Sequence, residues 1–109
     1  MNTYIVKMEH PDGPEWNKFV FEHVVYLKDL ISQGRVLASG PLKGTPLRAG
    51  FIIFRAENNE EVRAMVDADP FAREQLIVTL DIQQWDPLFG MLSDISSKNI
   101  PVELQALFE

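Results

Sequence analysis

Strand-forming residues mark the first element of the chain. The segment TYIVKM at residues 3–8 is rich in β-branched and aromatic side chains, which predicts a strand. Two further strands are predicted at residues 35–42 (RVLASGPL) and 50–56 (GFIIFRA), and the two are typical of a hairpin. The segment LIVTLDIQQW at residues 76–85 predicts the last strand.

Helical spacing of apolar residues marks two helices between these strands. The first is predicted over Glu15 to about Gln33, with Gly34 as its stop. Its apolar stripe comprises Trp16, Phe19, Val20, His23, Tyr26, Leu27 and Leu30. The second is predicted over residues 58–69, where the asparagine at the start supplies a cap and Pro70 ends the helix.

The predicted element order is β-α-β-β-α-β, which is the ferredoxin-like α+β arrangement with an antiparallel sheet. Helices then cover one sheet face only, while the other face still carries large side chains. We expect the same face of a second copy to cover it, which predicts a homodimer. The chain is interpreted as one domain over residues 1–109, with a core at 3–87. An extension at 88–109 carries two short apolar patches and is expected to form short helices that pack on a neighbour.

Composition narrows the range of partners. Sixteen acidic residues against ten basic ones give a formal net charge of −6, and no basic stripe is present. This disfavours nucleic acid and anionic membrane surfaces as partners. The absence of cysteine excludes disulfides, thiolate nucleophiles and cysteine-bound metals. No apolar run approaches the roughly 20 residues of a membrane span, and the first residues lack a signal-peptide pattern, so a cytoplasmic protein is expected.

One histidine on the first helix's apolar stripe is the main candidate for chemistry. His23 is interpreted either as an ordinary core histidine or as a proton-transfer group, and a buried imidazole needs a partner in both cases. Asp69 continues the stripe of Val62 and Val66 on the second helix, although an Asp-Pro turn alone also explains it. Asp67 is the competing carboxylate, but it faces away from that stripe.

The other histidine, His10, lies in the polar turn HPDGP and is predicted to be solvated. A metal site built from His10, Asp12 and His23 has no spacing typical of zinc or non-haem iron, so no metal is predicted. The chain also lacks a complete phosphate-binding loop and a G-x-S-x-G nucleophile turn.

Four segments together resemble the YCII-related family: HVVYLKDL, GRVLASGPL, GFIIFRAENNEEVRAMVDADPF and the closing DIQQW. The resemblance covers roughly Thr3 to Trp85. It implies a ferredoxin-like fold assembled as a dimeric α/β barrel. It also implies that the family's active-site histidine is His23 and its aspartate Asp69.

The resemblance further implies an activity. Characterised members include chloromuconolactone dehalogenase and chloro-hydroxyhydroquinone dehydrochlorinase, which eliminate HCl from intermediates of aromatic degradation without a cofactor. A lyase acting on a small hydroxylated aromatic or lactone is therefore expected, with His23 oriented by Asp69 as general base and acid. An isomerase or a monooxygenase on the same barrel and a non-enzymatic small-molecule binder are the alternatives.

The expected pocket is apolar, although each of its lining residues has a plain core role as its alternative. The expected substrate-binding residues are Tyr26, Ser39, Phe51 and Phe71, with Trp16 as a further candidate. Ser39 is expected to donate a hydrogen bond to the substrate. Arg48 and Arg73 are considered for an anionic group, and solvation is the default for both.

Overall fold

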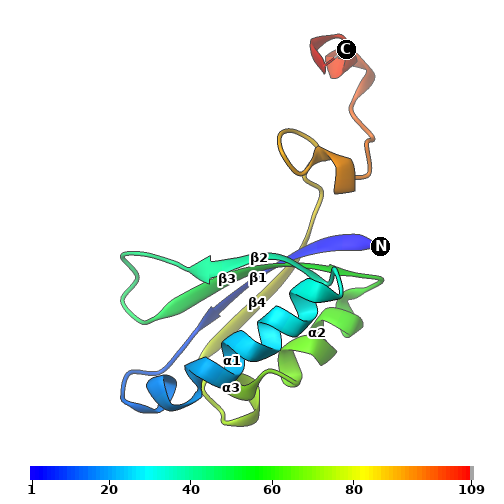
Figure 1. Ribbon diagram of the computed structural model, residues 1–109. Helices are drawn as coiled ribbons and strands as arrows, with labels where there is room; N and C mark the ends of the chain where they lie inside the picture. Colours follow the sequence, from blue (N-terminus) through cyan, green and yellow to red (C-terminus); the bar gives the residue numbers. More distant parts are fainter. Residues whose placement is uncertain (109) are drawn as a thin grey trace.

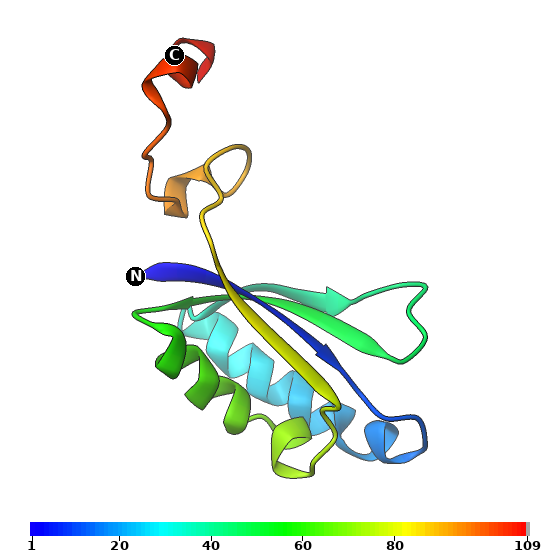
Figure 2. The same cartoon turned by 180° about the vertical axis from the view of Figure 1, so that it is seen from behind.

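The computed structural model describes residues 1–108 and contains a four-stranded antiparallel sheet in the order β2-β3-β1-β4. Its main elements are β1 (Asn2–Glu9), α1 (Glu15–Ser32), β2 (Val36–Pro41), β3 (Ala49–Ala56), α2 (Asn59–Asp67), α3 (Pro70–Arg73) and β4 (Thr79–Trp85). The helices lie together on one face of the sheet (Figures 1 and 2). The predicted ferredoxin-like α+β fold is confirmed.

The two-residue period of the strands divides the sheet into a covered and an open face. Val6 and Met8 of β1 and Ile52 and Phe54 of β3 point towards the helices and are almost fully buried. Their neighbours in sequence point the other way, so the open face carries side chains such as Ile53, which is only partly buried. The core therefore lies between the sheet and the helices.

The second helix was predicted to end at residue 69, and this end is wrong because α2 stops at Asp67. Asp69 has extended backbone angles (φ −67°, ψ 137°), and its side chain accepts a hydrogen bond from the Phe71 amide. A residue before proline avoids the helical region, and an aspartate is a good helix cap. The Asp-Pro sequence therefore ends one helix and starts another, α3, which the sequence pattern did not predict.

The last strand is also shorter than predicted and begins at Thr79. The Leu76 amide donates to the Phe71 carbonyl, which folds this part of the chain back onto the end of α3. Residues 76–78 therefore form a connection rather than a strand.

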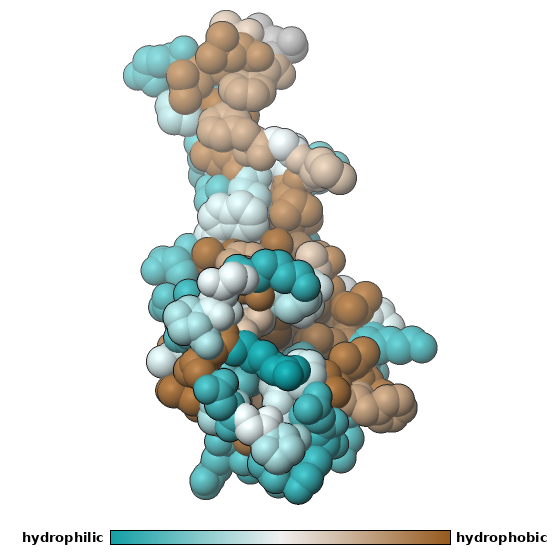
Figure 3. Space-filling model, turned by 90° about the vertical axis from the view of Figure 1, so that its left-hand side faces the viewer, coloured by the Kyte–Doolittle hydropathy of each residue, from teal (hydrophilic) through white to brown (hydrophobic). Residues whose placement is uncertain are grey.

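The extension after β4 projects away from the sheet and helices (Figures 1 and 2). It contains two 3₁₀ helices, η1 (Ser93–Ile95) and η2 (Val102–Phe108). Much of its surface is apolar (Figure 3), and Met91 and Leu107 are largely exposed. Within the described chain, α1 is the longest helix and is too polar to cross a membrane, and no other helix qualifies.

Candidate active site

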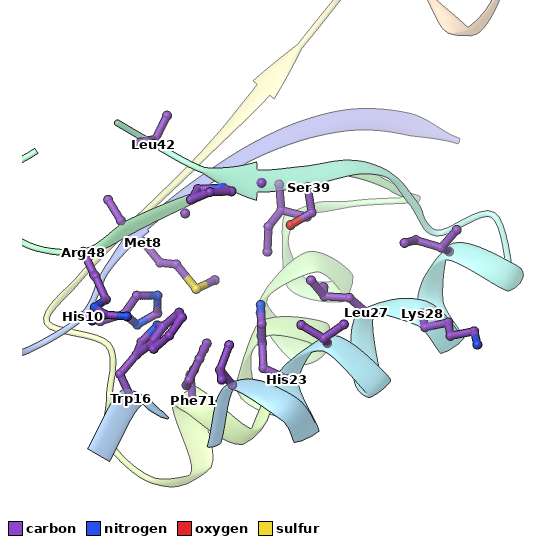
Figure 4. Close-up of a pocket in the computed structure, with 18 residues that line it drawn as sticks. Met8, His10, Trp16, His23, Leu27, Lys28, Ser39, Leu42, Arg48 and Phe71 are labelled. Carbon is purple, nitrogen blue, oxygen red and sulfur yellow. The ribbon is translucent and has the colours of Figure 1, made fainter. Parts of the chain in front are cut away.

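A cavity of about 630 Å³ opens between α1 and the edge of the sheet formed by β2 and β3 (Figure 4). The helix contributes Trp16, Val20, His23, Val24, Leu27 and Ile31, among others. The sheet and its loops contribute mainly Met8, His10, Ser39, Leu42, Arg48 and Ile52, and α3 contributes Phe71. Most of the wall is apolar, which suits a small organic molecule.

His23 and Asp69 meet at the base of this cavity. The Nδ1 atom of His23 lies 2.7 Å from Oδ2 of Asp69, and their side chains are only 13% and 3% exposed. Because an ionised carboxylate only accepts hydrogen bonds, the proton is on Nδ1. Nε2 of His23 has no protein partner within residues 1–108 and faces the cavity (Figure 4). Asp67, the competing carboxylate, is exposed on α2.

The Asp-Pro-Phe turn holds both the carboxylate and one aromatic wall of the site. Oδ1 of Asp69 accepts the Phe71 amide at 2.9 Å, so each carboxylate oxygen has a separate task. The Phe71 ring stacks on the His23 imidazole with the ring centroids 4.4 Å apart, and Phe71 is 1% exposed. This packing fixes both the position and the tilt of the imidazole.

His10 is buried, so the prediction that it is solvated is wrong. It is 4% exposed, and its Nδ1 donates to the Leu76 carbonyl at 2.7 Å. Its ring packs against Phe71 with the centroids 4.6 Å apart. The polar turn indicated exposure, but α3 and the connection after it cover this turn from a distant part of the chain. Burial lowers the pKa of His10 from its ordinary value of 6.5, and the Leu76 hydrogen bond acts in the opposite direction.

The lowered pKa of His10 predicts a stability that depends on pH. Well above pH 6.5 the imidazole is neutral in both folded and unfolded chains. As the pH falls below 6.5, the unfolded chain binds the proton first, so the free energy of unfolding decreases until the pH passes the folded-state pKa. Urea unfolding of wild type and His10→Asn, which does not titrate, checks this. A wild type that loses no more stability in acid than the variant would contradict it.

Two of the four predicted substrate-binding residues line the cavity, Ser39 and Phe71, and two do not. Tyr26 faces α2 instead, where its hydroxyl donates to the Met65 carbonyl at 2.6 Å. Phe51 lies on the open face of the sheet, because its neighbour Ile52 points towards the helices. The alternation along β3 was a signal in the sequence that could have separated these two neighbours.

Arg48 is exposed to solvent, as expected, and it also lines the cavity. Its guanidinium carbon is 4.1 Å from the centroid of the Trp16 ring, and both residues line the cavity. Arg73, by contrast, pairs with Glu22 and Glu74 on the surface, which agrees with the solvated position expected for it. Lys28 and Arg48 line the cavity, and among the described residues no aspartate or glutamate lines it, although the Asp69 carboxylate lies directly behind His23.

Residues 1–108 contain no group of three or more His, Asp or Glu side chains arranged to hold a metal ion. The polar side chains that line the cavity belong to His10, His23, Lys28, Ser39 and Arg48. These groups can move protons and bind oxygen atoms of a ligand.

Two solved structures are similar to this chain in fold. A 5-chloro-2-hydroxyhydroquinone dehydrochlorinase from Burkholderia phenoliruptrix AC1100, in complex with 2,5-dihydroxybenzoquinone, is 22% identical, with a TM-score of 0.68 over 77% of this chain and 93% of that one. Protein Atu4242 from Agrobacterium tumefaciens is 19% identical, with a TM-score of 0.51 over 80% of this chain and 93% of that one. No curated protein sequence matches the chain.

The sequence itself identifies the family. Residues 1–86 match the YCII-related domain, which is most of the chain and includes His10, His23, Asp69 and Phe71. Residues 87–109, which include the extension, lie outside the match. The chain therefore belongs to the YCII-related domain family.

Proposed function

We propose that the protein is a cofactor-free lyase that eliminates HCl from a chlorinated hydroxyaromatic compound, with His23 and Asp69 as a general acid–base pair. The observation that carries the proposal is the direction of the two imidazole nitrogens. Nδ1 of His23 is held by a buried carboxylate, and Nε2 opens into an apolar cavity. A nitrogen presented in this way is a base that can return the proton it takes.

The chemistry of the reaction suits such a pair. Conversion of a chloro-hydroxyhydroquinone into a hydroxybenzoquinone removes one H⁺ and one Cl⁻ and needs no external oxidant. The ring carbon that loses chloride must also gain a hydrogen, because a C–H bond replaces the C–Cl bond. A single imidazole can take the proton of one ring hydroxyl and deliver it to that carbon, while Asp69 stabilises the imidazolium between the two steps.

The walls of the cavity support the same substrate class. Deprotonation of a ring hydroxyl creates negative charge, and Arg48 at the cavity favours such an anion. Apolar side chains such as Val20, Val24 and Leu27 line the cavity and suit an aromatic ring. Ser39 lines the opposite wall and can donate a hydrogen bond to a ring oxygen. The structural similarity to a dehydrochlorinase with a bound quinone supports this choice over other small molecules.

A panel of substrates tests the reaction class. The protein is incubated with chlorinated and unchlorinated hydroxyhydroquinones while chloride and dissolved oxygen are recorded, and buffer alone measures spontaneous oxidation. A lyase releases chloride from the chlorinated ring and consumes no oxygen beyond the buffer rate. Oxygen uptake with both rings indicates a monooxygenase, and binding without turnover indicates a non-enzymatic binder.

We propose that two copies associate through the open faces of their sheets. Phe51 and Ile53 on this face are apolar and only partly buried within one chain. Ile5 of β1 lies directly opposite Ile53 in the register. A second sheet face would remove this apolar surface from water.

The dimer is expected to dissociate when a charge is placed at its centre. Ile53→Asp buries an unpaired carboxylate, which costs about 3 kcal/mol or more and weakens association about 100-fold or more. Sedimentation should give twice the 12.4 kDa chain mass for wild type and the single mass for the variant at equal concentration. Ala64→Asp on the exposed side of α2 is the matched control. A monomeric wild type would overturn the dimer.

A further inference from the structure

His10 offers the cavity a second imidazole that the proposed acid–base pair does not use. Its Nδ1–H is fixed on the Leu76 carbonyl at 2.7 Å, so in the neutral ring Nε2 carries a lone pair and no hydrogen. Nε2 has no protein partner within residues 1–108 and is not sealed from solvent, although the residue is 4% exposed. His10 lines the cavity (Figure 4), and Nε2 is the ring nitrogen that its bond to Leu76 leaves available for a ligand there.

The two histidines share one surface. The imidazoles of His10 and His23 both pack against the Phe71 ring, with centroid distances of 4.6 and 4.4 Å. They come from different elements, since His10 follows β1 and His23 lies within α1. Two hydrogen-bonding nitrogens therefore converge on one end of the cavity from two directions.

We propose that His10 is a second substrate-contacting group, whose Nε2 accepts the hydrogen of a second ring hydroxyl while His23 acts on the first. The proposal rests on the proposed function and assigns the residue that receives the second hydroxyl of its ring. It assigns to His10 a role that its polar turn did not indicate.

The reaction supplies a use for the second acceptor. In the first step the proton of one hydroxyl goes to His23 and then to the carbon that carries chlorine, which leaves one carbonyl on the ring. In the second step the other O–H bond breaks, its proton goes to Nε2 of His10, and its electron pair forms the second carbonyl. The C–Cl bond breaks at the same time with its pair on chloride, so the products are the quinone, H⁺ and Cl⁻.

The charges that face His10 favour its neutral form before the second step. Burial, the His23 imidazole and the Arg48 guanidinium lower its pKa, whereas the Leu76 hydrogen bond and the Asp69 carboxylate raise it. Because Asp69 bonds directly to Nδ1 of His23 and not to His10, the two histidines have different environments. Pairs of titratable groups held apart in this way divide acid and base roles between them.

Ligand binding tests this inference without turnover. Hydroquinone and phenol differ by one hydroxyl, and Trp16 in the cavity reports their binding by fluorescence. In His10→Asn the amide NH₂ can keep the bond to Leu76, but no acceptor remains at the position of Nε2. We expect the preference of wild type for hydroquinone over phenol to fall about 2- to 10-fold in His10→Asn, the value of one hydrogen bond. His10→Gln, whose longer amide reaches the cavity, is expected to restore part of it.

The same preference in wild type and His10→Asn would overturn the inference. Nitrogen-15 NMR of wild type provides a second test that needs no variant. We expect a neutral His10 with the hydrogen on Nδ1 and an Nε2 resonance that moves when hydroquinone is added. A hydrogen on Nε2 of His10 would overturn the inference as well. Neither test uses chloride release, so a protein that binds hydroquinone through His10 but releases no chloride would contradict the proposed function alone.

Discussion

Replacing His23 with asparagine is expected to slow chloride release from a chlorinated hydroxyhydroquinone about 10²- to 10⁴-fold, the usual contribution of a general base. The amide NH₂ of asparagine can take the position of Nδ1 and keep the buried Asp69 carboxylate partnered at a distance like the present 2.7 Å. Only the cavity-facing Nε2 is then lost. Steady-state kinetics should therefore show a fall in kcat with a small change in KM.

Tyr26→Phe is the matched control for this variant. Tyr26 lies one turn from His23 on α1, but its hydroxyl donates to the Met65 carbonyl and it does not line the cavity. We expect unchanged kinetics and a loss of about 1 kcal/mol in the free energy of unfolding. An His23→Asn variant that matches wild type in kcat would remove His23 from the mechanism.

Replacing Asp69 with asparagine is expected to abolish most activity by a different route. The amide oxygen of asparagine can still accept the Phe71 amide, so the cap of α3 is kept. The amide NH₂ then faces Nδ1 of His23 as a donor, which forces the imidazole hydrogen onto Nε2. An Nε2–H in the cavity cannot act as a base, so kcat should fall about 10²-fold or more.

The tautomer is the readout that separates this effect from a loss of structure. Nitrogen-15 NMR should place the His23 hydrogen on Nδ1 in wild type and on Nε2 in Asp69→Asn. Asp67→Asn removes the same charge from an exposed position on α2 and should change neither tautomer nor rate. If Asp69→Asn and Asp67→Asn lost equal activity, the loss would come from the removed charge and not from the His23 tautomer.

The meeting of His23 and Asp69 could be anticipated only in part from regular patterns. His23 lies on the apolar stripe of α1, as expected. Asp69 was expected to continue the helical stripe of Val62 and Val66, but α2 ends at Asp67 and the Asp-Pro turn positions the Asp69 carboxylate instead. The β-α-β-β-α-β order places the two helices side by side on one sheet face. Topology therefore predicted the neighbourhood of the pair, whereas helical periodicity did not predict the backbone that positions Asp69.

The direction of individual side chains, and burial by residues far away in the sequence, were harder to predict. Tyr26 shares the stripe of His23, but the stripe is wide enough to face α2 along one edge and the sheet along the other. Phe51 and Ile52 are adjacent, and only the register with β1 decides which of them points to the helices. His10 is buried by a partner 66 residues away, Leu76, which no local pattern around the HPDGP turn reveals.

The account is tested most directly by the stoichiometry of a single anaerobic reaction. Protein treated with a chelator and free of added cofactor is mixed with a chlorinated hydroxyhydroquinone, and chloride and quinone are measured together. We predict one chloride and one hydroxybenzoquinone for each substrate consumed, at a rate about 10²-fold or more above buffer. Quinone formation without chloride, or no product above the buffer rate, would contradict the proposed elimination.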